Sequence, residues 1–294
     1  MFEGVVYAIL AGCCFTAGAG LFAEVSRRGL PFIPFLSIGA MIGLVISLIA
    51  MVDWHAASSE SRIGELALWI IPGAVGNVAG HLAMSRAMAS GRAPVAWAIG
   101  QGGQALTFAS TVLIWNEKTG FLSWIGLLII LAGVTLLAKN KAESPKGPAV
   151  RGWVLWSLAA MTCYGVNQTL MSVPSHWTGW NDAAHLRLPI TLGVVGLTGF
   201  AFYGRIEMRA IRSILSWALP YGLVICGCFE LVYLSLDRLS AAGCAAIGWP
   251  LACSTGILGY AVWEHIVQHH QITRAEMIGI MTVVAGICAM AVRK

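Results

Sequence analysis

Ionisable side chains stand where the chain is otherwise apolar. His81 lies in residues 77–86, NVAGHLAMSR, inside an apolar run long enough to cross a lipid bilayer, and Glu230 lies in a second such run. An ionisable group at membrane depth is costly unless it is paired or hydrated. We therefore expect both side chains to face a wet cavity. Because carboxylates and imidazoles in such sites exchange protons near neutral pH, they are also our candidates for proton coupling.

The two groups occupy nearly equivalent points in their respective runs. Aligning Pro72 with Pro220 places His81 opposite Phe229, one residue from Glu230. We expect His81 and Glu230 to meet at the centre of the molecule. The residue types leave one alternative open, a buried pair that only fastens helices together.

Amide and aromatic side chains recur at helical spacing near these groups. Trp97, Gln101, Gln104 and Phe108 are separated by four, three and four positions, so they share one face of a helix. Aromatic faces stack on CH-rich surfaces, and amides supply donors and acceptors. This pattern predicts a pocket for a small neutral or zwitterionic molecule. The predicted substrate-binding residues are Asn77, His81, Trp97, Gln101, Gln104, Tyr164, Asn167, Gln168, Glu230, Tyr233 and Trp249.

Other kinds of chemical site are not indicated. The sequence contains no zinc motif, no Gly-x-Ser-x-Gly nucleophile elbow and no phosphate-cradling loop. His265 and His269 have helical spacing but no third ligand type nearby, and the eight cysteines fall in apolar runs. Asp182, His185 and Arg187 we interpret as an interfacial salt-bridge cluster. We predict no catalytic residue, no metal and no cofactor.

The composition is that of an integral membrane protein. Of the 294 residues, 58% are hydrophobic and only 11% are charged, against about 25% in soluble domains. Backbone groups in a bilayer must pair within the chain, so apolar runs of about 20 residues predict helices. We predict an all-α polytopic membrane protein with ten transmembrane helices. The expected spans are 3–23, 31–52, 66–87, 93–115, 120–138, 152–174, 184–204, 214–236, 239–263 and 275–292.

The chain divides into similar halves, 1–138 and 152–294, at a polar linker, residues 139–151. The segments IGLLIILAGV (125–134) and IGIMTVVAGI (278–287) both read Ile-Gly, five residues, then Ala-Gly. Five spans per half is an odd number, so the second half enters the membrane with the opposite orientation. We predict two inverted five-helix repeats, which are typical of transporters that alternate access around a midplane site.

A second pair of segments repeats the same relation. LIWNEKTG (113–120) and AVWEHIVQ (261–268) each place a Trp and a Glu at the end of a helix. The pair follows the fourth predicted span in one half and the ninth in the other. The match extends the internal similarity from the apolar spans to their polar ends.

Both halves resemble the EamA-type repeat of the drug/metabolite transporter superfamily, which also contains rhamnose-transporter-like sugar permeases. The resemblance is carried by the Gly-rich LAGCCFTAGAG, the connections SRAMASGRAPVAWAI and YLSLDRLSAAGCAAIGWPL, the WNEKTG turn and IGLLIILAGV. It implies ten helices in two inverted halves around a cavity lined chiefly by the third, fourth, eighth and ninth spans. It also implies a transporter rather than an enzyme.

We predict a secondary active transporter that moves a small polar metabolite, a sugar or an amino acid, by alternating access. Protons would couple through Glu230 or His81. An exporter of drugs or quaternary amines is the alternative, because Trp97, Trp249, Tyr233 and Glu230 would provide an aromatic box with an acid. A membrane-embedded enzyme or a scaffold subunit is the alternative of another class.

The surroundings of the protein follow from the same features. We expect a multi-pass protein of the plasma membrane, the bacterial inner membrane, that acts as a monomer or homodimer. Its partners would be lipid, a small-molecule substrate and protons; nucleic acid binding is not indicated. The bias of Lys and Arg toward loops after odd-numbered spans indicates termini outside the cytoplasm, whereas the resemblance suggests cytoplasmic termini.

Overall fold

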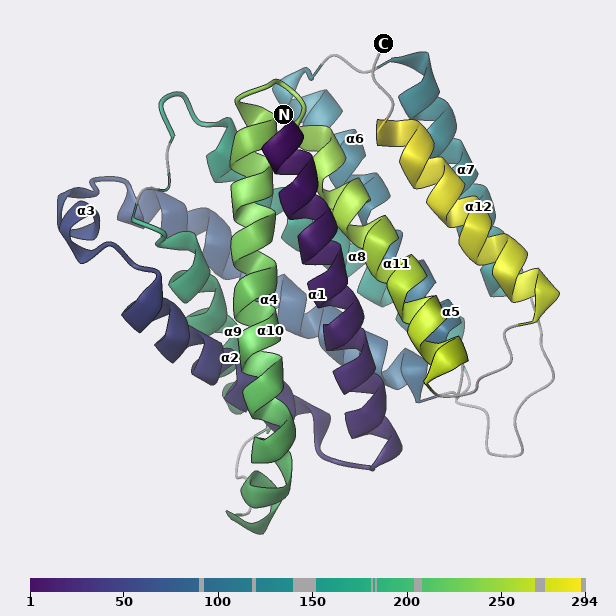
Figure 1. Ribbon diagram of the computed structural model, residues 1–294, viewed down its shortest axis with the longest axis horizontal. Coiled ribbons are helices and arrows are strands. Elements are labelled where there is room, and N and C mark those ends of the chain that lie inside the picture. The colour runs from purple at the N-terminus through teal and green to yellow at the C-terminus, as the bar shows by residue number, and fades with distance from the viewer. Residues whose placement is uncertain are drawn as a thin grey trace.

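The chain is helical because apolar segments that avoid water must satisfy their backbone groups internally. The computed structural model describes residues 1–89, 93–117, 120–139, 152–180, 182, 184–203, 208–267 and 273–291, and these contain α-helices and short 3-10 turns but no strand. The predicted all-α class is confirmed. Figure 1 shows the helices crossing as a slanted bundle, with the N-terminus at the upper end. We call this the amino-terminal end and the other the opposite end.

The helices follow the predicted apolar runs closely. The fourth run is divided into α5 and α6, and the second run is followed by a short extra helix, α3, whose first turn is capped by the Asp53 carboxylate. The bounds are α1 Phe2–Arg27, α2 Phe32–Ala50, α3 Trp54–Ser59, α4 Ile63–Met88, α5 Ala93–Gln101, α6 Gln104–Trp115, α7 Phe121–Lys139, α8 Trp153–Ser172, α9 Arg187–Tyr203, α10 Met208–Ser240, α11 Gly248–Ile266 and α12 Arg274–Ala291.

Five described helices are long and apolar enough to cross a membrane by length and composition. They are α1, α2, α4, the Ile211–Ser240 part of α10, and α11 with the turn η2 (Ala245–Ile247) before it. Shorter apolar stretches, Phe121–Gly133 and Arg187–Phe202, form parts of α7 and α9. These helices support a multi-pass membrane protein.

Helices from the two halves of the chain interleave in the bundle. α1 packs against α10 and α11, and α8 packs against α4, α5 and α6. α2 contacts both α9 and α10, while α4 also contacts α9. Each half therefore buries its apolar faces mainly against the other half rather than against itself.

The α7–α12 crossing depends on the glycines of the repeated Ile-Gly…Ala-Gly segments. A Cβ on Gly133 would lie 2.8 Å from the Val283 backbone nitrogen and 3.2 Å from the Gly279 carbonyl oxygen. A Cβ on Gly286 would lie 2.7 Å from both the Ile130 nitrogen and the Gly126 oxygen. Gly133 of α7 faces α12 in the same way as its counterpart Gly286 of α12 faces α7. The two helices therefore cross with near two-fold symmetry.

We expect Gly286→Ala to destabilise the protein, because its Cβ would meet rigid backbone on α7 rather than a flexible side chain. Overpacking of this kind costs about 1–3 kcal/mol. The measurement is the thermal unfolding temperature of detergent-purified protein. Gly227→Ala on α10 is the matched control, since nothing lies within 4 Å of its added Cβ; equal effects of the two substitutions would contradict a close crossing.

Candidate functional site

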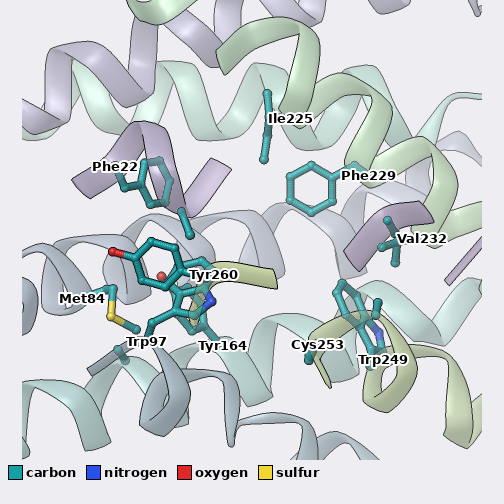
Figure 2. Packing of buried hydrophobic residues seen from close by; sticks show 14 of the residues in the cluster. Phe22, Met84, Trp97, Tyr164, Ile225, Phe229, Val232, Trp249, Cys253 and Tyr260 are labelled. Carbon is teal, nitrogen blue, oxygen red and sulfur yellow. The ribbon is translucent and has the colours of Figure 1, made fainter. Parts of the chain in front are cut away.

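A cavity at the centre of the bundle collects most of the predicted site. Figure 2 shows the packing of buried side chains in this region, with Trp97, Tyr164 and Tyr260 gathered together and Trp249 and Phe229 apart from them. The cavity has a volume of about 50 Å³, room for water but not for a metabolite. Eight of the eleven predicted residues line it: Asn77, His81, Trp97, Gln101, Tyr164, Asn167, Gln168 and Trp249.

Close helix packing brings α4 and α8 together at this cavity. Gly73, Gly76 and Gly80 form a stripe on α4 that faces α8, and a Cβ on Gly80 would lie only 2.6 Å from the Tyr164 ring. The missing side chain lets the Tyr164 ring lie against α4, where its hydroxyl bonds to His81 Nδ1 at 2.8 Å. This glycine stripe thus positions two of the predicted site residues, His81 and Tyr164.

Two polar atoms in the cavity wall have no hydrogen-bond partner in the described part of the chain. They are the indole nitrogen of Trp97, a donor, and the amide oxygen of Asn167, an acceptor. Both residues are buried, with 3% and 2% of their surface exposed. Because an unpaired buried polar group costs about 1–3 kcal/mol, a bound molecule that satisfies both would be stabilised there.

Other polar groups of the wall are already held by the protein. Thr107 donates to Gln168 Oε1 at 3.1 Å, and the Trp249 indole donates to Ser172 Oγ at 3.0 Å. The described lining residues include no Asp, Glu, Lys or Arg. The described wall of the central cavity therefore presents mainly apolar and aromatic surface, with a few amide and indole groups and the His81 imidazole.

Glu230 and Tyr233 lie outside this cavity, so the expectation that His81 and Glu230 meet is wrong. Glu230 Oε1 instead accepts a hydrogen bond from His185 Nδ1 at 2.7 Å. The reason is helical geometry, because successive residues point about 100° apart. Phe229 lines the central cavity, and the next residue along α10 consequently faces another one.

That other cavity, which we call the vestibule, lies at the amino-terminal end of the bundle and has a volume of about 420 Å³. Phe229 and Tyr233 stack with ring centroids 6.0 Å apart, one lining each cavity, so this aromatic pair separates them. The vestibule is lined by Trp180, Asp182, His185, Arg187, Glu230, Tyr233, Leu234, Asp237, Arg238 and Ala241.

Arg187 organises the wall of the vestibule. Its guanidinium is fully buried and donates to Asp182 Oδ2 at 3.0 Å, to Ser175 Oγ at 2.8 Å and to Asp237. It also lies over the Tyr233 ring at 4.5 Å. The sequence interpretation of Asp182 and Arg187 as a salt bridge is confirmed. It missed Asp237, which lies 50 positions away in a segment with no distinguishing polar pattern.

Aromatic side chains close the opposite end. Phe22 contacts Phe35, Tyr221 and His81 with ring centroids 5.0–6.0 Å apart. Sequence reasoning missed Phe22 and Tyr221, since an aromatic residue in an apolar span gives no sign of facing a cavity. The molecule is thus sealed on the Phe22 side and hollowed on the Tyr233 side.

The remaining predicted residue, Gln104, lies outside both cavities as they stand. It is fully buried on α6, and neither atom of its amide has a hydrogen-bond partner in the residues described. His265 is described and His269 is not, and no group of three metal-ligating side chains occurs in the described residues.

We expect Arg187→Met to destabilise the protein by about 3–5 kcal/mol, because Asp182 and Asp237 would lose their buried counter-charge. Thermal unfolding in detergent tests this. Arg238→Met is the control, because Arg238 is 60% exposed and its pair with Glu3 lies in solvent. If both variants unfolded at the wild-type temperature, the cluster would have no structural role.

Comparison with known proteins bears on the family and the fold of this chain. The model of the EamA-like transporter family matches residues 3–139, which confirms the predicted resemblance over the first half of the chain. No match was found among curated proteins. Among solved structures 27 chains match. One, titled only "Crystal structure of protein", is 15% identical, with a TM-score of 0.63, and the match covers 98% of this chain and 96% of that one. At this identity the likeness shows a shared fold alone.

Proposed function

We propose, from the match of residues 3–139 to the EamA-like transporter family, that this protein is a secondary transporter that carries a small uncharged polar metabolite. The observation that carries the proposal is the uncharged central cavity, with the unpaired Trp97 donor and Asn167 acceptor in its wall. We place the protein in the plasma membrane as a multi-pass monomer or homodimer.

The absence of charge in the described wall favours a neutral cargo. A carboxylate or ammonium group moved into a buried site needs a counter-charge, and the central cavity offers neither Asp or Glu nor Lys or Arg. A sugar-like molecule needs what is there, namely ring faces, amides and an indole donor. Of the two classes predicted from sequence, the sugar class is therefore favoured over amino acids.

The quaternary amine alternative loses part of its support. It depends on a cage in which Trp97 and Trp249 combine with Tyr233 and Glu230. The first two line the central cavity, whereas the other two line the vestibule. The Tyr233 ring is moreover already covered by the Arg187 guanidinium.

Alternating access is supported by the pattern of helix contacts. We propose that ten spans form two inverted repeats, in which α1, α2, α4, α5 with α6, and α7 correspond to α8 through α12. Under that correspondence the α1–α10 contact is the counterpart of α4–α8, and α2–α10 is the counterpart of α4–α9. The α7–α12 crossing is its own counterpart, in keeping with its reciprocal glycines.

The volume of the central cavity fits a closed step of such a cycle. A cavity of about 50 Å³ has to enlarge before it admits a metabolite. The stacked Phe229 and Tyr233 separate it from the vestibule, while Phe22 and Tyr221 cover it from the other side. We propose that movement of these two aromatic groups alternately exposes the cavity.

Substrate identity is tested by thermal-shift screening of the purified protein against sugars, polyols, amino acids and quaternary amines, since a ligand of the native state raises its melting temperature. Hits are then tested by counterflow in proteoliposomes. We expect neutral hydroxylated compounds to stabilise the protein. Stabilisation by amino acids or amines alone would contradict an uncharged cargo, and binding without counterflow would contradict transport.

We expect Gln101→Ala to weaken binding of such a hit by about 5–30-fold, as expected for the loss of one hydrogen bond in a buried site. Isothermal titration of purified protein measures it. Thr162→Ala on α8 is the control, because Thr162 is exposed and its hydroxyl donates to the Leu158 carbonyl of its own helix. Unchanged affinity in the Gln101 variant would remove that residue from the site.

Proton coupling through Glu230 or His81 remains our proposal, with Glu230 favoured because it borders the vestibule next to Tyr233. We expect Glu230→Gln to abolish substrate accumulation driven by a pH gradient while counterflow continues. The measurement is uptake into proteoliposomes with and without the gradient. Accumulation at the wild-type level would exclude Glu230 as the coupling residue.

A further inference from the structure

The hydrogen bonds of His176 require one more proton than a neutral ring provides. His176 ends the turn η1 (Val173–His176), and its Nδ1 lies 2.9 Å from the Ser172 carbonyl oxygen. A carbonyl only accepts, so Nδ1 carries a hydrogen. Nε2 lies 3.3 Å from Glu117 Oε1. In a neutral ring that nitrogen would direct a lone pair at a carboxylate, so the contact needs an added proton between the two groups.

The other two partnered histidines of the site do not need an added proton. A neutral His185 donates from Nδ1 to Glu230 at 2.7 Å. For His81, either Nδ1 or the Tyr164 hydroxyl supplies the hydrogen of their 2.8 Å contact. Among these three, only the His176–Glu117 contact requires a charged imidazole or a protonated carboxyl group.

The surroundings of His176 favour the charged ring. The Trp115 indole stacks on it with centroids 4.0 Å apart and planes at 11°, a geometry that attracts a cation. Glu117 is its direct counter-charge, and both side chains are about nine-tenths buried. The other charged groups around η1 that belong to the described residues are engaged elsewhere. They are Asp237 on α10, held by Ser175 and Arg187, Asp182 bound to Arg187, and Arg62 on α4, which lies over Trp177 and pairs with Glu65.

The repeated Trp and Glu segments give this pair a counterpart at the opposite end. There Glu264 Oε1 accepts hydrogen bonds from Arg27 at 2.9 Å and from the Tyr260 hydroxyl at 2.8 Å. In both places the Glu at the end of a repeated segment binds a cation at or just beyond the end of α1 or α8. Arg27 keeps its charge at every physiological pH, whereas an imidazole loses its charge near neutrality.

We propose that His176 and Glu117 form a proton-binding latch that holds α6 to α8 and α11 at the amino-terminal end and so keeps the central cavity closed toward that end, an inference that rests on the transport function proposed above. The latch reaches the central cavity. Glu117 Oε2 accepts from the backbone N–H of Ala246 within η2, which leads into α11, and Ser172 Oγ accepts from the Trp249 indole. The proton thus joins the end of α6 to α8 and α11, which both line the cavity.

Release of the proton is a simple acid dissociation. The Nε2–H bond breaks, its electron pair stays on nitrogen, and the proton passes to water. Lone pairs of Nε2 and Glu117 then face each other at a contact of 3.3 Å, which becomes repulsive. A rise in pH therefore opens the central cavity toward the amino-terminal end, while the Arg27–Glu264 latch at the opposite end does not respond.

The test is a distance measurement by electron spin resonance between labels at Leu113 on α6 and Thr178 beyond η1, both exposed. Ketone-bearing amino acids carry the labels, so that the eight native cysteines stay in place. The full chain is studied in lipid nanodiscs from pH 5.5 to 9. Above the midpoint we expect the closed-to-open ratio to fall by up to about tenfold per pH unit, as for loss of a single proton.

Two variants should remove this response. His176→Arg, which reproduces the permanent charge of the Arg27 latch, should stay closed throughout, and Glu117→Gln should give distances that do not depend on pH. Glu264→Gln is the matched control at the opposite end and should keep the wild-type response. A wild-type distance that ignores pH, or a pH response that persists in Glu117→Gln, would overturn the latch. If the His176→Arg variant fails to fold, the Glu117→Gln variant alone tests the latch.

The same experiment separates the latch from the proposed function. Distances are recorded without substrate, so a pH response with no metabolite binding would count against the transport proposal alone. Metabolite binding and counterflow without any pH response at Leu113 and Thr178 would overturn the latch alone.

Discussion

The cost of placing an unsatisfied polar group away from water governs this structure. A chain that is 58% hydrophobic still buries Arg187, His81 and several amides, and leaving such a group without a hydrogen-bond partner is costly. Arg187 is satisfied by two carboxylates and Ser175. Trp97 and Asn167 are left with unpaired atoms at a cavity instead. That difference separates the groups that hold the helices together from those available to a ligand.

Charge is distributed unevenly along the axis of the bundle. The vestibule gathers Asp182, Glu230 and Asp237 with Arg187 and His185, whereas the described wall of the central cavity carries no Asp, Glu, Lys or Arg. The Phe229–Tyr233 stack divides the two. The charged side chains of the vestibule are thus kept apart from the mainly aromatic wall of the central cavity.

The two halves use similar segments in unequal ways. The glycines of α7 and α12 form an almost symmetric crossing, because in each half the missing Cβ allows close contact with the backbone of the other helix. The glutamates of the repeated Trp and Glu segments are also used at both ends, but one binds Arg27 and the other binds His176. A symmetric scaffold with different cations at its ends responds to protons at one end only.

The sequence by itself determined the helical class and the positions of the apolar spans, because hydropathy and helical spacing are local properties. Of the eleven site residues that it predicted, eight line the central cavity. It did not determine which way neighbouring residues face. Glu230 follows Phe229, yet a turn of about 100° sends it to the vestibule and away from His81. The Arg187–Asp237 and His176–Glu117 pairs also depended on tertiary structure, since each joins residues at least 50 positions apart that only helix packing brings within hydrogen-bond distance.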